Sequence, residues 1–425
     1  MSHWSLVLRT NDYGPMTNDL RFNPVESLAD MRHEFGEHGG VNMSIEASTT
    51  FTVLEPELLP KLFQGQLGPA SGGFYLYGRH YNPTVYVLGR ELAALEGTEA
   101  GYCTASGMSA VAAVVLQCCD QGDHIVASDA LYGGTYALFH DFLPRKSGIR
   151  STFVDVSDFN ALEAAFTGRT RLLYVESLSN PTLVVADIPR LADLAHSHGA
   201  VLAVDNTFSP VFLSPAQLGA DVVIHSLTKF INGASDCIAG AICAKRELID
   251  RMMDLHGGAL MLLGPTMDPR VAFEISLRMP HLGLRIAEHG RRALDFSHRL
   301  AERGLSVIYP GMASHPQHQL LARLANPGFG YGGIFCVDLG TAERANRFME
   351  LLQNEESFGY IAVSLGYFDT LLSCSASSTS SELSPADQRR AGISPGLVRI
   401  SLGYTGSLKQ RWEQLADALD RLDDK

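Results

Sequence analysis

The stretch Asp221-Val-Val-Ile-His-Ser-Leu-Thr-Lys-Phe-Ile-Asn-Gly233 is the most informative part of this sequence. Its apolar, β-branched start is typical of a buried strand, and it ends in Ser226, Thr228 and Lys229. Open α/β sheets bind ligands at the carboxyl ends of their strands. Two hydroxyl groups beside one amine therefore suit a phosphorylated ligand held near the lysine. A single lysine after a strand is more often a solvated loop residue, so this interpretation needs support from elsewhere.

Other predicted strands end in polar side chains that would meet Lys229 at the same edge. Asp205 ends one of them, and a carboxylate there can keep a pyridine nitrogen protonated, which makes pyridoxal phosphate an electron sink. A strand that ends at Glu176 is followed by Asn180, an amide suited to the phenolic oxygen of that ring. Tyr132 has the shape to stack on the ring face. Each residue alone has a structural explanation, and their convergence indicates the cofactor.

A further phosphate-binding device lies upstream. Gly107 and Met108 open the helical window Ser109–Leu116, where unpaired backbone N–H groups and the helix dipole favour an anion. A plain helix cap at Ser106 explains the same residues equally well. The sequence contains neither a P-loop motif nor a Gly-x-Gly-x-x-Gly turn after a predicted strand, which disfavours P-loop NTPases and nicotinamide-dependent dehydrogenases.

Strand-like and helix-like segments alternate through the middle of the chain, which predicts an α/β fold with a mostly parallel sheet and helices on both faces. We expect an N-terminal arm over residues 1–81, a cofactor-binding large domain over 82–280 and a smaller α+β domain over 281–425. The predicted strands of the large domain are His124–Ser128, Arg171–Glu176, Val201–Val204, Val222–His225 and Ala239–Ala244, and its clearest helices are Phe159–Phe166 and Ile188–His198.

Composition excludes several classes of protein. Of 425 residues 46% are hydrophobic and 19% charged, as in ordinary globular chains, so a disordered or fibrous protein is excluded. The net charge of −13 disfavours a nucleic-acid partner. No apolar run approaches the roughly 18 residues of a membrane span, and no secretory signal is visible. With seven cysteines, an odd number, we expect a cytoplasmic protein without membrane contact.

From Phe35 to the C-terminal helix the chain resembles the Cys/Met-metabolism family of fold-type I pyridoxal-phosphate (PLP) enzymes, and Asp221–Ala234 matches the lysine signature of that family. Within the family it is most similar to the plant-type methionine γ-lyase subfamily. The segments that carry this finer resemblance are Glu34–Ser48, Leu262–Met267, Pro280–Arg285 and Ser373–Leu383.

The resemblance implies a role for each residue that matches the family pattern. Lys229 would hold the PLP aldehyde and act as catalytic base, and Tyr132 would also assist proton transfer at the substrate sulfur. Tyr77 and Arg79 would reach the phosphate of a neighbouring subunit, which implies shared active sites in a homotetramer built as two dimers. The remaining implied cofactor contacts are Gly107, Met108, Ser226 and Thr228 at the phosphate, Asp205 at the ring nitrogen and Asn180 at the phenolic oxygen.

For the substrate, the resemblance implies that Arg399 binds the α-carboxylate, framed by Ser364 and Thr379. Arg399 lies in an apolar predicted strand, where a fixed structural ion pair is the alternative. Relatives that use cystathionine have a glutamate where this chain has Val363, and an apolar residue suits a methyl thioether. Bacterial methionine γ-lyases have a cysteine at the position of Gly134, so one specificity element of that group is absent.

The resemblance therefore implies α,γ-elimination of L-methionine, which gives methanethiol, ammonia and 2-oxobutanoate. Alternatives on the same scaffold are γ-replacement on an O-acyl-homoserine, as in cystathionine γ-synthase or O-acetylhomoserine sulfhydrylase, and the cystathionine γ-lyase reaction. A non-catalytic protein that keeps the fold is a further alternative. We expect no metal site, because the histidine pairs 196/198 and 315/318 lack nearby cysteines or carboxylates that would complete one.

Overall fold

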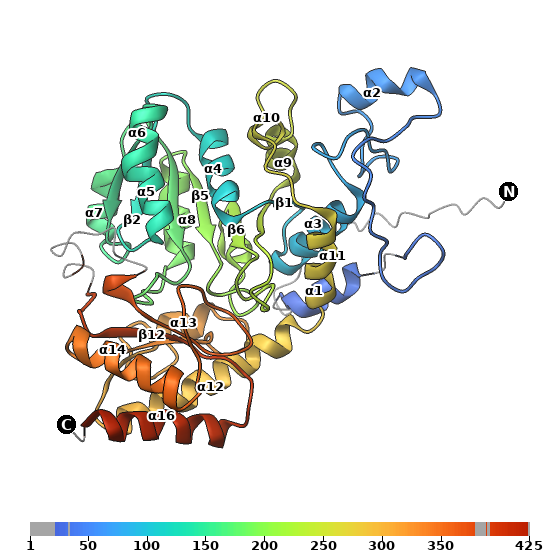
Figure 1. The fold of residues 1–425 in the computed structure, drawn as a ribbon. Coiled ribbons are helices and arrows are strands. Elements are labelled where there is room, and N and C mark those ends of the chain that lie inside the picture. Colours follow the sequence, from blue (N-terminus) through green and yellow to red (C-terminus); the bar gives the residue numbers. More distant parts are fainter. Residues whose placement is uncertain (1–21, 33–34, 379–387, 389–391, 424–425) are drawn as a thin grey trace.

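Two β-sheets organise the chain in the computed structural model, which describes residues 22–32, 35–378, 388 and 392–423 (Figure 1). The larger sheet has seven strands in the order β1-β7-β6-β5-β4-β2-β3. Neighbours from β3 to β6 pair in parallel, and β7 is antiparallel to both β6 and β1. Its strands are β1 (Ala100–Thr104), β2 (His124–Ser128), β3 (Arg150–Val154), β4 (Thr170–Glu176), β5 (Val201–Asp205), β6 (Val222–Ser226) and β7 (Gly240–Ala244).

Helices cover both faces of this sheet, as the sequence predicts. In β6, Val223 packs in the same apolar cluster as Leu88 and Leu92 of α3, and its neighbour Ile224 packs with Val111 of α4. Successive strand residues point to opposite faces, so α3 and α4 lie on different sides. The helices of this part are α3 (Pro83–Glu96), α4 (Gly107–Cys118), α5 (Gly133–Ala137), α6 (Leu143–Lys146), α7 (Phe159–Ala165), α8 (Ile188–Ser197), α9 (Arg246–Met252), α10 (Ala259–Leu263) and α11 (Pro269–Arg278).

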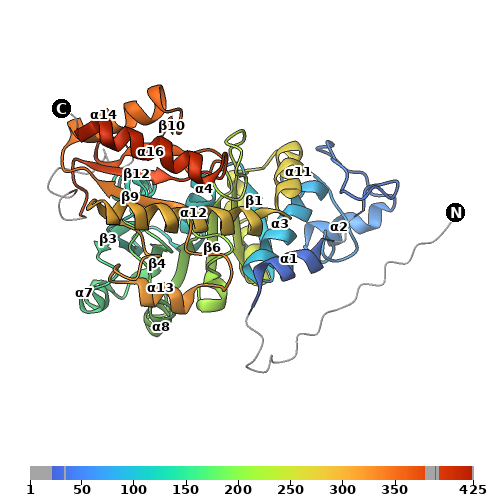
Figure 2. The same cartoon turned by 90° about the horizontal axis from the view of Figure 1, so that it is seen from below.

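The smaller sheet has the order β10-β11-β12-β9-β8 and packs with its helices at one end of the larger one (Figures 1 and 2). It is antiparallel except for the β10–β11 pair. Its strands are β8 (Ser306–Ile308), β9 (Ile334–Asp338), β10 (Tyr360–Ile361), β11 (Leu371–Cys374) and β12 (Leu397–Ser401). The helices of this part are α12 (Leu282–Glu302), α13 (His318–Leu324), α14 (Ala342–Glu350) and α16 (Leu408–Asp423).

Residues 35–81 extend from the body on the side away from α14 and α16 (Figure 1). Helix α1 (Pro24–Met31), which the sequence analysis did not predict, packs on α3, and Arg32 next to it forms an ion pair with buried Glu91 at 2.7 Å. A short helix follows, α2 (Leu59–Phe63). Val41 and Leu54 are 90% and 93% exposed in the single chain. The residue limits of the arm and of the two domains stay a prediction.

In the part of the chain that the structure describes, no helix combines the length and the apolarity needed to cross a membrane.

Candidate active site

A cavity of about 300 Å³ opens where β4, β5 and β6 end. Parallel strands bring their carboxyl ends to one edge of the sheet, so residues far apart in sequence meet there. The cavity wall is completed from the part of the chain that contains the smaller sheet, by Val363, Leu365 and Arg399. The predicted site residues that line it are Gly107, Met108, Tyr132, Asn180, Asp205, Ser226, Thr228, Lys229, Val363 and Arg399.

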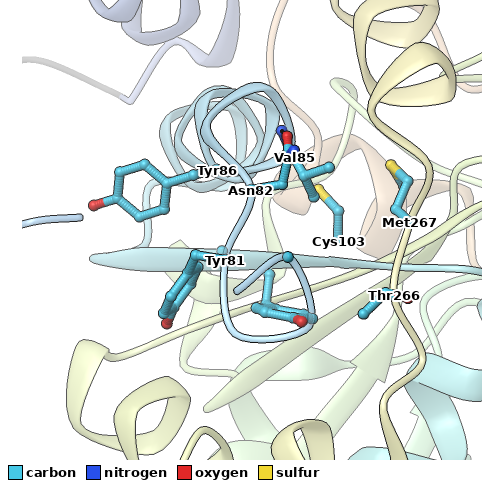
Figure 3. A pocket seen from close by; sticks show the side chains of 10 residues that line it. Tyr81, Asn82, Val85, Tyr86, Cys103, Thr266 and Met267 are labelled. Atoms are coloured by element: carbon cyan, nitrogen blue, oxygen red, sulfur yellow. Dashed lines mark hydrogen bonds between the residues drawn. The ribbon is translucent and has the colours of Figure 1, made fainter. Parts of the chain in front are cut away.

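A second cavity, between α3 and β1, is much smaller, at about 10 Å³ (Figure 3). Its lining includes Tyr81, Tyr86, Tyr102 and Cys103. That volume is about what one water molecule needs. No predicted site residue lines it, so the larger cavity is the candidate active site.

Lys229 lies in the connection that follows β6. Its ammonium Nζ donates to Ser364 Oγ at 2.9 Å, so the predicted lysine and a predicted substrate-binding serine are in contact. Burial, with a smaller contribution from the charge of Arg399, lowers the pKa of Lys229 to about 8. A substantial neutral fraction near pH 7 to 8 is what a nucleophilic or basic lysine requires.

Asp205 ends β5 with its carboxylate directed to the cavity. Its Oδ1 accepts a hydrogen bond from the Thr207 amide at 3.0 Å, and its Oδ2 accepts one from the Tyr174 hydroxyl at 3.2 Å. Burial nevertheless raises the pKa of Asp205 above its usual value. A cationic ring nitrogen beside this carboxylate would offset that burial, so the site fits a protonated pyridine.

The start of α4 forms the candidate phosphate cradle. Ser106 caps the helix, and its hydroxyl accepts from the Ser109 amide at 3.1 Å. The sequence is compatible with a cap and with an anion site here; the cap is present, and it leaves the first helical amides free of intrahelical partners. A Cβ atom at Gly107 would lie 2.8 Å from Ser226 Cβ, so only glycine lets this helix start approach the end of β6 so closely. The Thr228 hydroxyl accepts from the Ala239 amide at 2.9 Å.

Tyr132 immediately precedes α5 and is half-exposed over the cavity. A Cβ atom at Gly134 would lie 2.6 Å from Tyr132 Cε1. The absence of a side chain at position 134 thus permits the ring orientation of Tyr132, and a cysteine there would require the ring to move.

Arg399 lies on β12 and is only 2% exposed. Its Nη1 donates to Asn180 Oδ1 at 2.9 Å and its Nη2 to the Ser364 carbonyl at 3.0 Å. Among the described residues it has no carboxylate partner, and its Nε has no acceptor. Burial lowers its pKa to about 10. A buried cation without a counter-charge is unfavourable, so an anionic ligand such as a carboxylate suits this site.

Two predicted residues lie elsewhere. Tyr77 and Arg79 do not line the cavity, and Arg79 Nη1 donates to the Met261 carbonyl at 2.7 Å instead. Their reach into a neighbouring subunit therefore stays a prediction. Thr379 lies outside the described residues.

Sequence reasoning assigned no role to Glu176 and did not name Ile238, although both line the cavity. Glu176 had a detectable signal, because it ends β4 in register with Asp205 at the end of β5. Ile238 had none, because it lies in an irregular connection. Ile238 and Val363 are 69% and 70% exposed in the single chain, and they are apolar side chains on the cavity wall.

Comparison with known proteins gives consistent results. The profile of the family described as Cys/Met metabolism PLP-dependent enzymes matches residues 27–411. The chain is 57% identical to a methionine gamma-lyase of Arabidopsis thaliana over 94% of its own length and 91% of the relative's. It is 35% identical to an O-succinylhomoserine sulfhydrylase of Pseudomonas aeruginosa, over 92% and 94% of the two chains.

Solved structures show the same fold. A cystathionine gamma synthase of Xanthomonas oryzae pv. oryzae superposes with a TM-score of 0.84 at 30% identity, over 95% of this chain and 99% of that one.

Proposed function

This chain belongs to the Cys/Met metabolism family of PLP-dependent enzymes, and we propose that it cleaves L-methionine by α,γ-elimination to methanethiol, ammonia and 2-oxobutanoate. The observation that carries the proposal is the cavity itself. Lys229 and Arg399 line it together with the apolar side chains of Ile238 and Val363, which form an apolar part of its wall. Such a wall suits a methyl thioether and offers no partner to a distal ammonium group. The 57% identity to a methionine gamma-lyase supports the same choice.

Pyridoxal phosphate, when bound, supplies an electron sink that stabilises negative charge developing on the substrate. The residues of the cavity fit it: Lys229 to hold its aldehyde carbon, and Asp205 to keep its ring nitrogen protonated. The amides of Gly107 and Met108, with the hydroxyls of Ser226 and Thr228, would hold its phosphate. Asn180 would lie at its phenolic oxygen, and Tyr132 would stack on its ring.

The protein's own groups then orient the substrate and move protons. Arg399 binds the α-carboxylate, with Ser364 beside it and Thr379 as a further proposed contact. Lys229 would remove the proton from Cα, and its lowered pKa of about 8 suits that task. Tyr132, which lines the same cavity, would pass a proton to the departing sulfur.

The test is a product assay on the purified holoenzyme. Methanethiol released from L-methionine is measured beside thiol addition to O-acetylhomoserine, for the wild type and for Lys229→Ala. We expect elimination to dominate in the wild type, and Lys229→Ala to retain the fold but lose turnover and absorbance near 420 nm. Predominant thiol addition would instead establish a γ-replacement enzyme, and normal turnover by Lys229→Ala would refute the lysine's role.

We also propose a homotetramer built as two dimers, in which the arm over residues 1–81 carries Tyr77 and Arg79 to the neighbouring subunit's phosphate site. The exposure of apolar Val41 and Leu54 supports an arm that packs against another subunit. A cytoplasmic location is proposed from the seven cysteines, an odd number that does not suggest a disulfide framework.

A further inference from the structure

Glu176 is a buried carboxyl group in the cavity wall with no role in the proposed reaction. It ends β4 directly beside Asp205 at the end of β5. Burial and the neighbouring charge of Asp205 raise the pKa of Glu176, whereas backbone hydrogen bonds from Tyr132 and Asn180 lower it and so favour the ionised carboxylate. A second carboxyl group in this position is unfavourable unless its contacts compensate for the burial.

The two carboxylate oxygens of Glu176 bind two different segments of the site. Oε1 accepts a hydrogen bond from the Tyr132 amide at 2.6 Å, and Oε2 accepts one from the Asn180 amide at 3.2 Å. Tyr132 belongs to the segment that enters α5, and Asn180 to the segment that leaves β4. One side chain therefore ties together two segments that are 48 residues apart in the sequence (180 − 132).

The connection continues from Asn180 to the substrate end of the cavity. Asn180 Oδ1 accepts from Arg399 Nη1 at 2.9 Å, and the Ser364 carbonyl accepts from Arg399 Nη2 at 3.0 Å. Asn180 is thus held at its backbone by Glu176 and holds Arg399 with its side chain. An unbroken series of hydrogen bonds runs from the Tyr132 backbone to the arginine.

We propose that Glu176 is a positioning residue that holds Tyr132 in place and, through Asn180, aims Arg399 at the carboxylate of the substrate. This inference rests on the proposed function only in requiring an amino-acid substrate whose α-carboxylate Arg399 binds. A carboxylate serves because both of its oxygens accept. The isosteric glutamine has one acceptor, so its amide –NH₂ would face either the Tyr132 or the Asn180 backbone N–H.

Two ligands that differ only in a carboxylate test this role. L-Norleucine resembles methionine but has no leaving group, and n-pentylamine is norleucine without its carboxylate. Dissociation constants are measured from the change in cofactor absorbance of the holoenzyme. For Glu176→Gln we expect norleucine to bind about tenfold more weakly and pentylamine to change little, because a buried backbone N–H would lose its acceptor and Arg399 would be held less well. The inference would be overturned if Glu176→Gln weakened the binding of both ligands equally, or if it weakened the binding of neither.

The matched control is Glu163→Gln, because Glu163 is an exposed carboxylate on α7 that lines neither cavity. It should keep the wild-type preference for norleucine. Asn180→Ala and the double variant Glu176→Gln/Asn180→Ala complete a double-mutant cycle. If Glu176 acts through Asn180, the double variant loses no more norleucine preference than Asn180→Ala alone, whereas additive losses contradict the route.

If Glu176→Gln does not give a folded holoenzyme, Asn180→Ala alone decides the route to Arg399: a retained norleucine preference would refute it, and a selective loss would support it. Neither ligand is cleaved, so these results stand apart from the product assay. A chain that binds norleucine as expected but releases no methanethiol would contradict the proposed function and leave the role of Glu176 intact.

Discussion

At the scale of single residues, Val363 shows how one side chain sets the chemistry of a cavity. Its carbonyl lies 3.4 Å from Arg399 Nη2, so its backbone belongs to the proposed carboxylate-binding end of the site. Its side chain is apolar and 70% exposed at the cavity. If Arg399 binds the α-carboxylate as proposed, the backbone of Val363 lies beside a group that every amino-acid substrate has, and its side chain is available to the part that differs between substrates.

Substitution of Val363 should therefore alter selectivity. In Val363→Glu a new carboxylate would face a methyl thioether without a partner but could pair with a distal ammonium group. We expect kcat/KM for L-methionine to fall roughly tenfold or more, and the ratio of cystathionine to methionine cleavage to rise. Parallel assays of the two substrates measure this. Val363→Ile serves as control, and an unchanged ratio in Val363→Glu would show that the side chain does not face the substrate.

At the scale of elements, α12 is fastened to the end of β12 by His289. This ring is fully buried, and its Nδ1 donates to the Leu402 carbonyl at 2.6 Å. Phe230, which follows the proposed cofactor lysine, and Tyr404 approach it edge-on with ring centroids 5.2 and 5.0 Å away. The contact joins the lysine-bearing segment to the smaller sheet's part of the chain.

Burial lowers the pKa of His289 to about 4, so the folded chain keeps the ring neutral. The unfolded chain binds a proton below about pH 6.5, and the stability that a neutral histidine contributes is therefore complete above that pH and lost as the pH falls toward 4. Between pH 7.5 and 5.0 we expect the stability difference between wild type and His289→Phe to shrink by about 2 kcal/mol. Urea unfolding of both holoenzymes at one subunit concentration measures it. A difference that stays constant with pH would mean that His289 has the same pKa in the folded and unfolded chains, so that burial does not keep its ring neutral.

Prediction of elements from the sequence succeeded where burial on both faces gives a continuous apolar run. Strands β2, β4, β5, β6 and β7 were predicted to within one residue at each end. Strand β3 was not, because Arg150–Val154 lies at the sheet edge and alternates exposed and half-buried residues. Strand β1 reads Ala-Gly-Tyr-Cys-Thr, and it is a strand because β7 pairs with it rather than because of its own propensity.

At the scale of the whole molecule, the sequence predicted which residues gather in the cavity but not how they are joined. Lys229, Asp205 and Asn180 lie at or just after the ends of the neighbouring strands β6, β5 and β4, so the parallel-sheet pattern alone brings them together. The bond between Asn180 and Arg399 joins residues 219 positions apart and depends on how the smaller sheet's part packs on the larger. No local pattern encodes that packing, which is why the position of Glu176 in the same network emerged only from the structure.

Whether one chain is sufficient for activity depends on how whole subunits assemble. In the single chain Arg79 donates to the Met261 carbonyl and does not line the cavity. If the neighbouring subunit supplies Arg79, then Arg79→Ala and Lys229→Ala damage different components of each shared site. A mixed dimer has one site with both substitutions and one with neither.

Co-refolding equal amounts of these two weakly active or inactive variants should therefore restore about a quarter of wild-type activity, because half of randomly formed dimers are mixed and each has one intact site. Methanethiol release before and after co-refolding measures the gain, and each variant refolded alone is the control. If Arg79 acted within its own chain, every site in every mixture would carry one of the two substitutions. Activity would then remain at the average of the two variants, and the proposed sharing of active sites would have to be abandoned.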